Sequence, residues 1–151
     1  MIDERIAAID ASIYRVVAKA VIVRDRKLLL TLEIPDQQLY GLPGGGIDHG
    51  ESVMTALRRE LAEELNLTIA EDQISQAPIG VRFSIFQCRD KRLSGMPYLN
   101  LYYQVNLGDD QIPMAGEKEF IWADSEVLGN LNIVNTQIDD IPLFRSYMET
   151  T

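Results

Sequence analysis

The sequence predicts an α+β fold, built as an αβα sandwich with a mixed β-sheet between helices. Strand-like segments lie on both sides of one strong amphipathic helix, and further helical segments follow near the C-terminus. We find neither an internal repeat nor a low-complexity segment. The 151 residues, 46% of them apolar, are enough to bury one core. We therefore expect a single domain that spans residues 1–151.

The first strands of the predicted sheet precede the helix. Residues 14–23 are rich in β-branched side chains and predict a buried strand, residues 27–33 predict a second, and the polar turn between them indicates a hairpin. Residues 34–38 contain a proline and predict a loop. This loop leads into Leu42-Pro43-Gly44-Gly45-Gly46, where three consecutive glycines disfavour a helix.

Residues 52–65 form the predicted helix. Ser52 is suited to cap its N-terminus, because a serine hydroxyl can accept a hydrogen bond from a free backbone amide. Apolar side chains recur every four residues, at Val53, Leu57, Leu61 and Leu65. This period predicts one amphipathic helix.

The remaining elements follow the helix. Residues 81–88 predict a strand, and residues 98–107 predict another, whose alternating apolar and polar residues indicate that it is half-buried. Shorter segments complete the prediction: a surface loop at 108–116, a strand at 119–123, and helices at 125–131 and 143–148.

Charge and cysteine content exclude several classes of protein. A net charge of −9 argues against non-specific nucleic-acid binding, which draws its energy from lysine and arginine contacts to phosphates. The single cysteine, Cys88, cannot form an internal disulfide, so the fold does not depend on an oxidising compartment. The N-terminus lacks the apolar stretch of a signal peptide, and no segment reaches the roughly 20 apolar residues that span a bilayer. We expect a cytoplasmic protein without membrane contact.

Acidic side chains on the helix predict a metal site. Glu60, Glu63 and Glu64 fall within one arc of about 100°. Like charges at this spacing repel, and a divalent cation removes the conflict because carboxylate oxygens suit Mg²⁺ or Mn²⁺. Such an ion would let an acidic protein bind an anionic diphosphate. Because Glu64 projects near the apolar stripe, we expect it to be the least solvated of the three.

The spacing of these residues resembles the signature of the Nudix hydrolases, G-x5-E-x7-R-E-U-x-E-E-x-G-U, in which U is a bulky aliphatic residue. Eight of the nine defined positions match: Gly45, Glu51, Arg59, Glu60, Leu61, Glu63, Glu64 and Leu67. The departure is Asn66 in place of glycine, and asparagine also tolerates left-handed backbone angles at a helix end. Taken separately, a charged run is usually a solvated helix face and a glycine cluster is usually a turn. The resemblance implies the Nudix fold from about residue 14 to residue 128.

The resemblance also implies roles for individual residues. The implied metal ligands are Glu60, Glu63, Glu64 and the carbonyl of Gly44 or Gly45. Glu51 and Arg59 would form an ion pair that braces the loop against the helix. Together with Glu60 and Glu64, this pair makes up the implied catalytic set.

Family members often add an acidic residue from a later loop, as a ligand or general base, a few residues before a tryptophan. Glu117, which precedes Trp122, is the candidate in this chain. Glu119 is an alternative, and so are Asp109 and Asp110 if their loop folds over the site. Each of these residues is equally well explained as a solvated acid on a loop.

Tyr40 and Arg89 are candidate substrate contacts. Tyr40 stands where many relatives carry an aromatic residue, so it either packs on the core or flanks the site. Arg89 belongs with Lys91 and Arg92 to a basic patch that could meet a phosphate, although a solvated turn is the simpler explanation. His49, the only histidine, lies in the variable part of the signature and receives no catalytic role.

The implied reaction is hydrolysis of a diphosphate linkage in a nucleoside diphosphate joined to a moiety X, such as a nucleoside triphosphate or a nucleotide sugar, by metal-activated water. Glu60, Glu64 or Glu117 would accept the proton. The expected partners are Mg²⁺ or Mn²⁺ and a small phosphorylated substrate, and the resemblance makes a homodimer reasonable. One alternative is a Nudix-fold module that binds a nucleotide without cleaving it, which would be expected to have lost some of these glutamates. A helical interaction protein is another, but it would not require the glycines.

Overall fold

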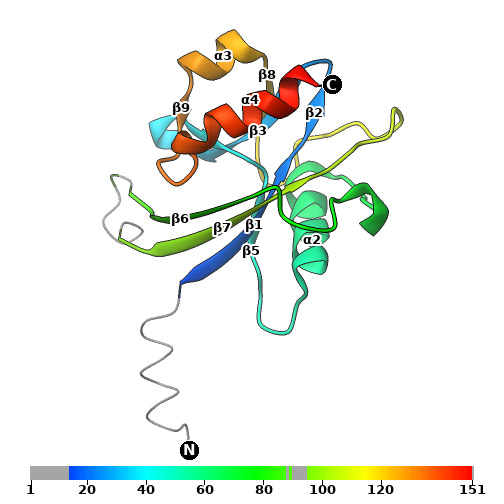
Figure 1. The fold of residues 1–151 in the computed structure, drawn as a ribbon, viewed down its shortest axis with the longest axis horizontal. Helices are drawn as coiled ribbons and strands as arrows, with labels where there is room; N and C mark the ends of the chain where they lie inside the picture. The colour runs from blue at the N-terminus through cyan, green and yellow to red at the C-terminus, as the bar shows by residue number, and fades with distance from the viewer. Residues whose placement is uncertain (1–13, 88, 90–94, 151) are drawn as a thin grey trace, which may run out of the picture.

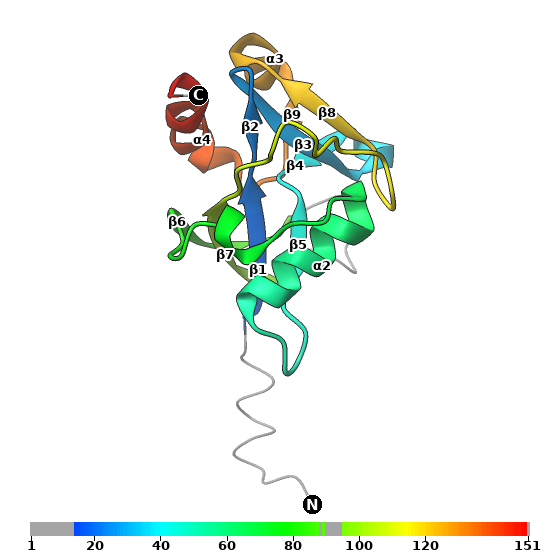
Figure 2. The same ribbon diagram turned by 90° about the vertical axis from the view of Figure 1, so that its right-hand side faces the viewer.

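The computed structural model describes residues 14–87, 89 and 95–150. Its strands form two sheets, and the helices cover them from different sides (Figures 1 and 2). Helix α2 (Val53–Leu65) covers one side, while α3 (Ser125–Asn130) and α4 (Ile141–Glu149) lie on the other. The predicted layering of helices around β-structure is confirmed, with two sheets in place of the single sheet that we expected.

The first sheet has the strand order β5-β1-β7-β6. Strand β1 (Arg15–Val21) runs parallel to β7 (Pro97–Gln104) and antiparallel to β5 (Gly44–Gly46), and β6 (Gly80–Ile85) pairs antiparallel with β7. The sheet is therefore mixed, as predicted. The sequence did not reveal β5, in which the three glycines pair with Val17, Ala18 and Lys19 of β1.

The second sheet has the order β2-β3-β4-β9, with β8 also paired to β3. Its strands are β2 (Val23–Arg24), β3 (Lys27–Ile34), β4 (Leu39–Gly41), β8 (Phe120–Ala123) and β9 (Asn132–Ile133). The predicted hairpin is present as β2 and β3, joined by a turn at Asp25 and Arg26, which both have positive φ. The segment predicted as one strand from residue 14 to 23 is split between the two sheets.

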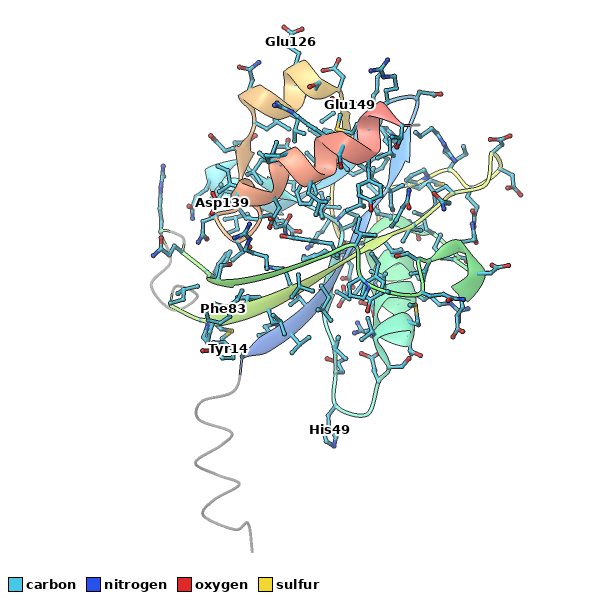
Figure 3. All side chains as sticks on the ribbon, viewed as in Figure 1. Tyr14, His49, Phe83, Glu126, Asp139 and Glu149 are labelled. Carbon is cyan, nitrogen blue, oxygen red and sulfur yellow. The ribbon has the colours of Figure 1, made fainter. Side chains whose placement is uncertain are left out.

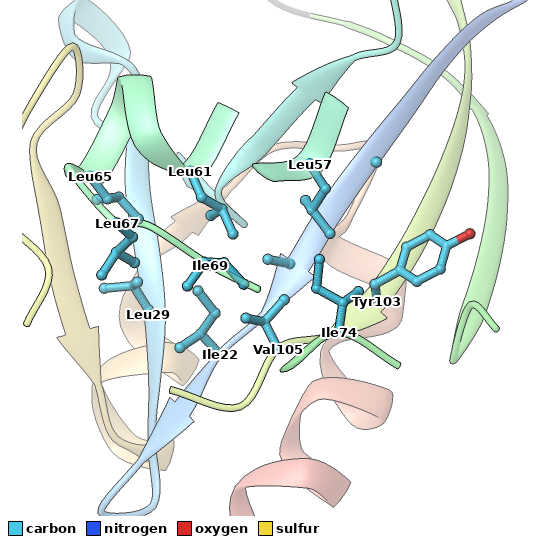
Figure 4. Packing of buried hydrophobic residues seen from close by; sticks show 12 residues of the cluster. Ile22, Leu29, Leu57, Leu61, Leu65, Leu67, Ile69, Ile74, Tyr103 and Val105 are labelled. Carbon is cyan, nitrogen blue, oxygen red and sulfur yellow. The ribbon is translucent and has the colours of Figure 1, made fainter. Parts of the chain in front are cut away.

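Alternating side chains on the strands supply two apolar cores. Ala18, Ala20 and Leu29 face α2, where they pack with Leu57, Leu61 and Leu65 in the core that Figure 4 shows. Val21, Leu28 and Leu30 face the other way, toward Leu128 of α3 and Phe144 and Met148 of α4. This alternation places the sheets between two helical layers.

Strand β7 is buried on both faces, so the prediction of a half-buried strand was wrong. Asn100 and Tyr102, on the face expected to be solvated, are 1% and 0% exposed. They are buried because the segment that leads into α4 covers this face and satisfies their polar groups. The Tyr102 hydroxyl donates to Asp140 Oδ2 at 2.7 Å, and Asp140 also accepts a bond from Arg82 at 2.7 Å.

The three predicted helices are confirmed, with small changes at their ends. Ser52 caps α2 as expected, because its hydroxyl accepts a bond from the amide of Thr55 at 3.1 Å. Asn66 ends the helix with a left-handed φ of 54°. Three short 3₁₀ helices complete the fold: η1 (Pro35–Gln37), η2 (Glu71–Gln73) and η3 (Ile138–Asp140). Within the described residues, no helix is long and apolar enough to cross a bilayer.

Candidate active site

The glycine strand β5 lies directly against two glutamates of α2. A Cβ atom on Gly45 would stand 2.5 Å from Glu60 Oε1, so a side chain there would displace that carboxylate. The amide of Gly44 donates to Glu64 Oε2 at 3.1 Å. At Gly45, glycine is needed because the Glu60 carboxylate approaches the backbone closely.

Glu64 is the most buried of the helix glutamates, as predicted. The side chain of Glu64 is 2% exposed, compared with 16% for Glu60 and 41% for Glu63. Burial raises the pKa of Glu64 to about 7, although nearby Lys118 and Lys19 oppose the shift. Lys118 Nζ lies 3.1 Å from Glu64 Oε1. A carboxyl with this pKa can exchange a proton near neutral pH.

The predicted ion pair between Glu51 and Arg59 is present and bidentate. Arg59 Nε and Nη2 donate to the two Glu51 oxygens at 2.8 and 2.9 Å. These bonds lower the pKa of Glu51 to about 2. Arg59 also contacts Glu60 at 3.0 Å, Glu63 at 3.3 Å and the Gly46 carbonyl at 3.2 Å. The guanidinium thus ties the loop after β5 to the acidic face of α2.

A cleft of about 360 Å³ opens beside the glycine strand. The predicted site residues that line it are Gly44, Gly45, Glu60, Glu64 and Glu117. Glu63 is not among the lining residues, and its carboxylate accepts a bond from Arg59 at 3.3 Å. The structure therefore gathers part of the predicted ligand set around one space.

Residues 114–117 close the C-terminus of α2 and place Glu117 at the cleft. The amides of Gly116 and Glu117 donate to the carbonyls of Glu64 and Glu63, at 2.9 and 3.0 Å. These bonds satisfy carbonyls that the end of a helix leaves free. The neighbouring acids Asp109, Asp110 and Glu119 do not line the cleft.

Four charged residues of the cleft were not predicted from the sequence: Arg15, Lys19, Glu33 and Lys118. Lys19 Nζ donates to the Gly44 carbonyl at 2.9 Å and lies 3.4 Å from Glu33, while Lys118 contacts both Glu33 and Glu64. Burial alone would raise the pKa of Glu33, but the two lysines outweigh it and lower that pKa. The signal for Lys19 was its place inside an apolar strand, where an ammonium group is costly without a partner.

The two candidate substrate contacts do not line the cleft. Tyr40 packs against the core beneath α3 and α4. Of the two alternatives given for it, packing on the core is therefore confirmed. Arg89 donates its backbone amide to Gln37 at 3.4 Å, and Cys88, Lys91 and Arg92 lie outside the described residues. His49 stands on the loop between β5 and α2, pointing away from the fold (Figure 3).

Comparison with known proteins identifies the family. The family model described as NUDIX domain matches residues 13–141. The chain belongs to this family. This confirms the resemblance drawn from the signature, that of a MutT-like Nudix hydrolase.

Relatives of this Nudix chain differ in length and identity. It is 38% identical over 76 residues to an RNA pyrophosphohydrolase of Ruthia magnifica subsp. Calyptogena magnifica, a match that covers 50% of this chain and 42% of that relative. The chain thus matches less than half of the relative's length. Two solved structures are also similar. The E. coli dihydroneopterin triphosphate pyrophosphohydrolase has a TM-score of 0.71 at 14% identity, with 92% of this chain and 99% of that one covered. A MutT NUDIX hydrolase from Burkholderia pseudomallei has a TM-score of 0.60 at 26% identity, covering 83% and 95%.

Nudix proteins generally use divalent metal ions, and the chemistry of the cleft fits one. Glu60, Glu64 and Glu117 offer carboxylate oxygens and the glycine strand offers carbonyls, all hard donors suited to Mg²⁺ or Mn²⁺. Among the described residues, no three acidic, histidine or cysteine side chains are already gathered as a metal site. Arg59 supplies the counter-charge to Glu60, and Lys118 supplies it to Glu64.

Removing the Glu51 carboxylate should weaken catalysis through Arg59. With Glu51→Gln, Arg59 loses its bidentate partner and is expected to turn toward Glu60 and Glu63. We expect kcat/KM to fall about 10- to 100-fold, the usual effect of losing a residue that orients a ligand. The matched control is Asp48→Asn, because Asp48 also approaches Arg59, at 3.4 Å, but is 71% exposed. Asp48→Asn should change kcat/KM less than twofold, and equal losses in both variants would contradict the brace.

The buried Glu64 should make the stability of the metal-free protein depend on pH. The folded-state pKa of about 7 is above the ordinary glutamate value of 4.5, so protonation favours the folded state. The contribution of Glu64 to the free energy of unfolding is fully present below pH 4.5 and is lost as pH rises through 7. The total loss is about 3 kcal/mol. Urea unfolding at pH 5 and pH 8, in chelator, should show this loss in the wild type. In Glu64→Gln, the fall in unfolding free energy between these two pH values should be smaller than in the wild type by the amount that Glu64 contributes. An identical pH dependence in both proteins would refute the assignment.

Proposed function

We propose that this Nudix protein hydrolyses the diphosphate linkage of a small nucleotide-like substrate, a nucleoside diphosphate joined to a moiety X, with Mg²⁺ or Mn²⁺ as cofactor. The observation that carries the proposal is the placement of Glu60 and Glu64 against the glycine strand at one cleft. Oxygen donors for a cation and space for a phosphorylated ligand meet there.

In the proposed reaction, a water oxygen bonds to one phosphorus while the bond from that phosphorus to the bridging oxygen breaks. The proton released by the water passes to a carboxylate of the cleft. Glu60, Glu64 and Glu117 all line this space, and any one of the three could accept the proton. A divalent ion held by these carboxylates would lower the pKa of water and neutralise charge on the diphosphate.

The relatives support the type of bond that we propose. Two of them are pyrophosphohydrolases by name, one for RNA and one for dihydroneopterin triphosphate. The net charge of −9 favours a small nucleotide over RNA in this chain. The single domain, the cytoplasmic location and the homodimer stay predictions from the sequence.

The test is a hydrolysis panel of nucleoside triphosphates, nucleotide sugars, ADP-ribose and dinucleoside polyphosphates, each with Mg²⁺, with Mn²⁺ and with chelator. We expect phosphate or pyrophosphate release from one substrate class, abolished by chelator. Binding without turnover across the panel would instead establish a nucleotide-binding module.

A further inference from the structure

Two aromatic side chains of the cleft have no part in the proposed reaction. Phe86 and Tyr98 both line the cleft, with ring centroids 5.6 Å apart and planes inclined by 56°. Phe86 is fixed at the end of β6 by backbone bonds of 2.8 Å to Met96 and Gly95. Both rings are only partly buried, so each presents surface to the cleft.

These rings lie at the end of the cleft opposite Glu64. Parallel pairing of β1 and β7 sets Arg15 beside Tyr98, and Lys19 beside Tyr102. The acidic end of the cleft lies near Lys19. Lys19 Nζ donates to the Gly44 carbonyl, and the Gly44 amide donates to Glu64. The pair of Lys19 and Tyr102 is four residues along the strand, about 13 Å, from the pair of Arg15 and Tyr98. The cleft therefore has an acidic end and an aromatic end.

Arg15 begins beside Tyr98, at the aromatic end, and has no ionic partner among the described residues. Lys19, Lys118 and Arg59 each contact a carboxylate, whereas Arg15 makes no ion pair with any residue in the part of the chain that the structure describes. A Cβ atom on Gly46 would lie 2.4 Å from Arg15 Nη2, so the guanidinium rests on the glycine strand. Arg15 also lines the cleft and is free to bind an anion there.

We propose that Phe86 and Tyr98 form an aromatic platform for the nucleobase of the substrate, in which the base stacks on one ring and meets the inclined second ring at its edge. We propose also that Arg15 binds the phosphate nearest the sugar. The inference rests on the proposed function, since it takes the acidic end as the place of the diphosphate. Every base offers a π face to an aromatic side chain. The platform should therefore bind nucleotides more tightly than sugar phosphates that lack a base, and should bind different bases with similar affinity.

The test measures binding, so that it does not depend on turnover. AMP and ribose 5-phosphate share the sugar and the phosphate and differ only in the base. By calorimetry in Mg²⁺, AMP should bind the wild type about tenfold more tightly than ribose 5-phosphate. UMP should bind within about fivefold of AMP. Phe86→Leu and Tyr98→Leu should each reduce the ratio of AMP to ribose 5-phosphate affinity to about threefold or less.

Three variants serve as controls. Phe83→Leu removes a ring from the same strand, but this ring is on the opposite face, 51% exposed and packed on Tyr14 (Figure 3), so the ratio should not change. Tyr98→Phe keeps a ring and should keep the ratio, which separates stacking from misfolding. Arg15→Gln should weaken AMP and ribose 5-phosphate equally.

Failure of the platform is distinguishable from failure of the reaction. An unchanged ratio in both leucine variants, equal binding of AMP and ribose 5-phosphate by the wild type, or a preference above tenfold between AMP and UMP would overturn the platform, whatever the hydrolysis panel shows. If the panel shows no cleavage while the ratio falls only in the leucine variants, the platform stands and the proposed reaction is wrong.

Discussion

Glu64→Gln is expected to lower kcat for diphosphate hydrolysis about 10³-fold while the protein stays folded. The amide keeps the shape of the side chain, and its oxygen can still accept the Gly44 amide. What is lost is the negative charge that would hold a cation and accept a proton, and a positioned general base typically contributes about 10²- to 10⁴-fold. The measurement is kcat at saturating substrate and metal.

Two comparisons make this result specific. Glu71→Gln removes an acid that is 67% exposed and lies outside the cleft, so it should change kcat less than twofold. A loss below tenfold in Glu64→Gln would remove Glu64 from the catalytic set. Circular dichroism of both variants checks that the fold is retained.

Gly44→Ala is expected to destabilise the protein by more than about 3 kcal/mol and to lower its Tm by roughly 10 °C. Gly44 has a φ of 128°, and a Cβ atom there would lie 2.1 Å from the Ala18 carbonyl oxygen. That oxygen belongs to the backbone of a central strand, which cannot move aside without breaking the pairing of β1 and β5. Thermal unfolding measures the change.

Gly50→Ala is the matched control for Gly44→Ala. Gly50 also has a positive φ, 85°, but nothing lies within 4 Å of a Cβ atom built there. Only the backbone strain remains, so the cost should be about 1 kcal/mol. Similar losses in both variants would show that the contact with Ala18 is not responsible.

The elements that the sequence predicted correctly are those whose pattern is local. Helix α2 shows its apolar period and its serine cap within fourteen residues, and the signature glutamates share that helix. Strand β5 could not be predicted because glycines have no alternating pattern, and only pairing with β1 makes them a strand. Burial of Asn100 and Tyr102 depends on Thr136 and Asp140, more than thirty residues later in the chain.

The same distinction applies to the candidate site. The ion pair of Glu51 and Arg59 was expected because the resemblance to the family signature implies it, and the two residues lie only eight apart in the sequence. Glu33, Lys19 and Lys118 come from three separate segments, and their contacts exist only in the folded chain. Nothing near Glu33 in the sequence distinguishes it from a solvated acid at the end of a strand.

The parallel pairing of β1 with β7 has a consequence for the order of folding. Arg15 must find Tyr98, 83 residues later, before the central strand is paired on both sides. The segment that carries the family signature is synthesised well before this partner, so it cannot complete the sheet by itself. Long-range pairing of this kind slows folding and leaves strand edges exposed meanwhile. Until β7 emerges from the ribosome, the edge of β1 that pairs with it therefore stays open.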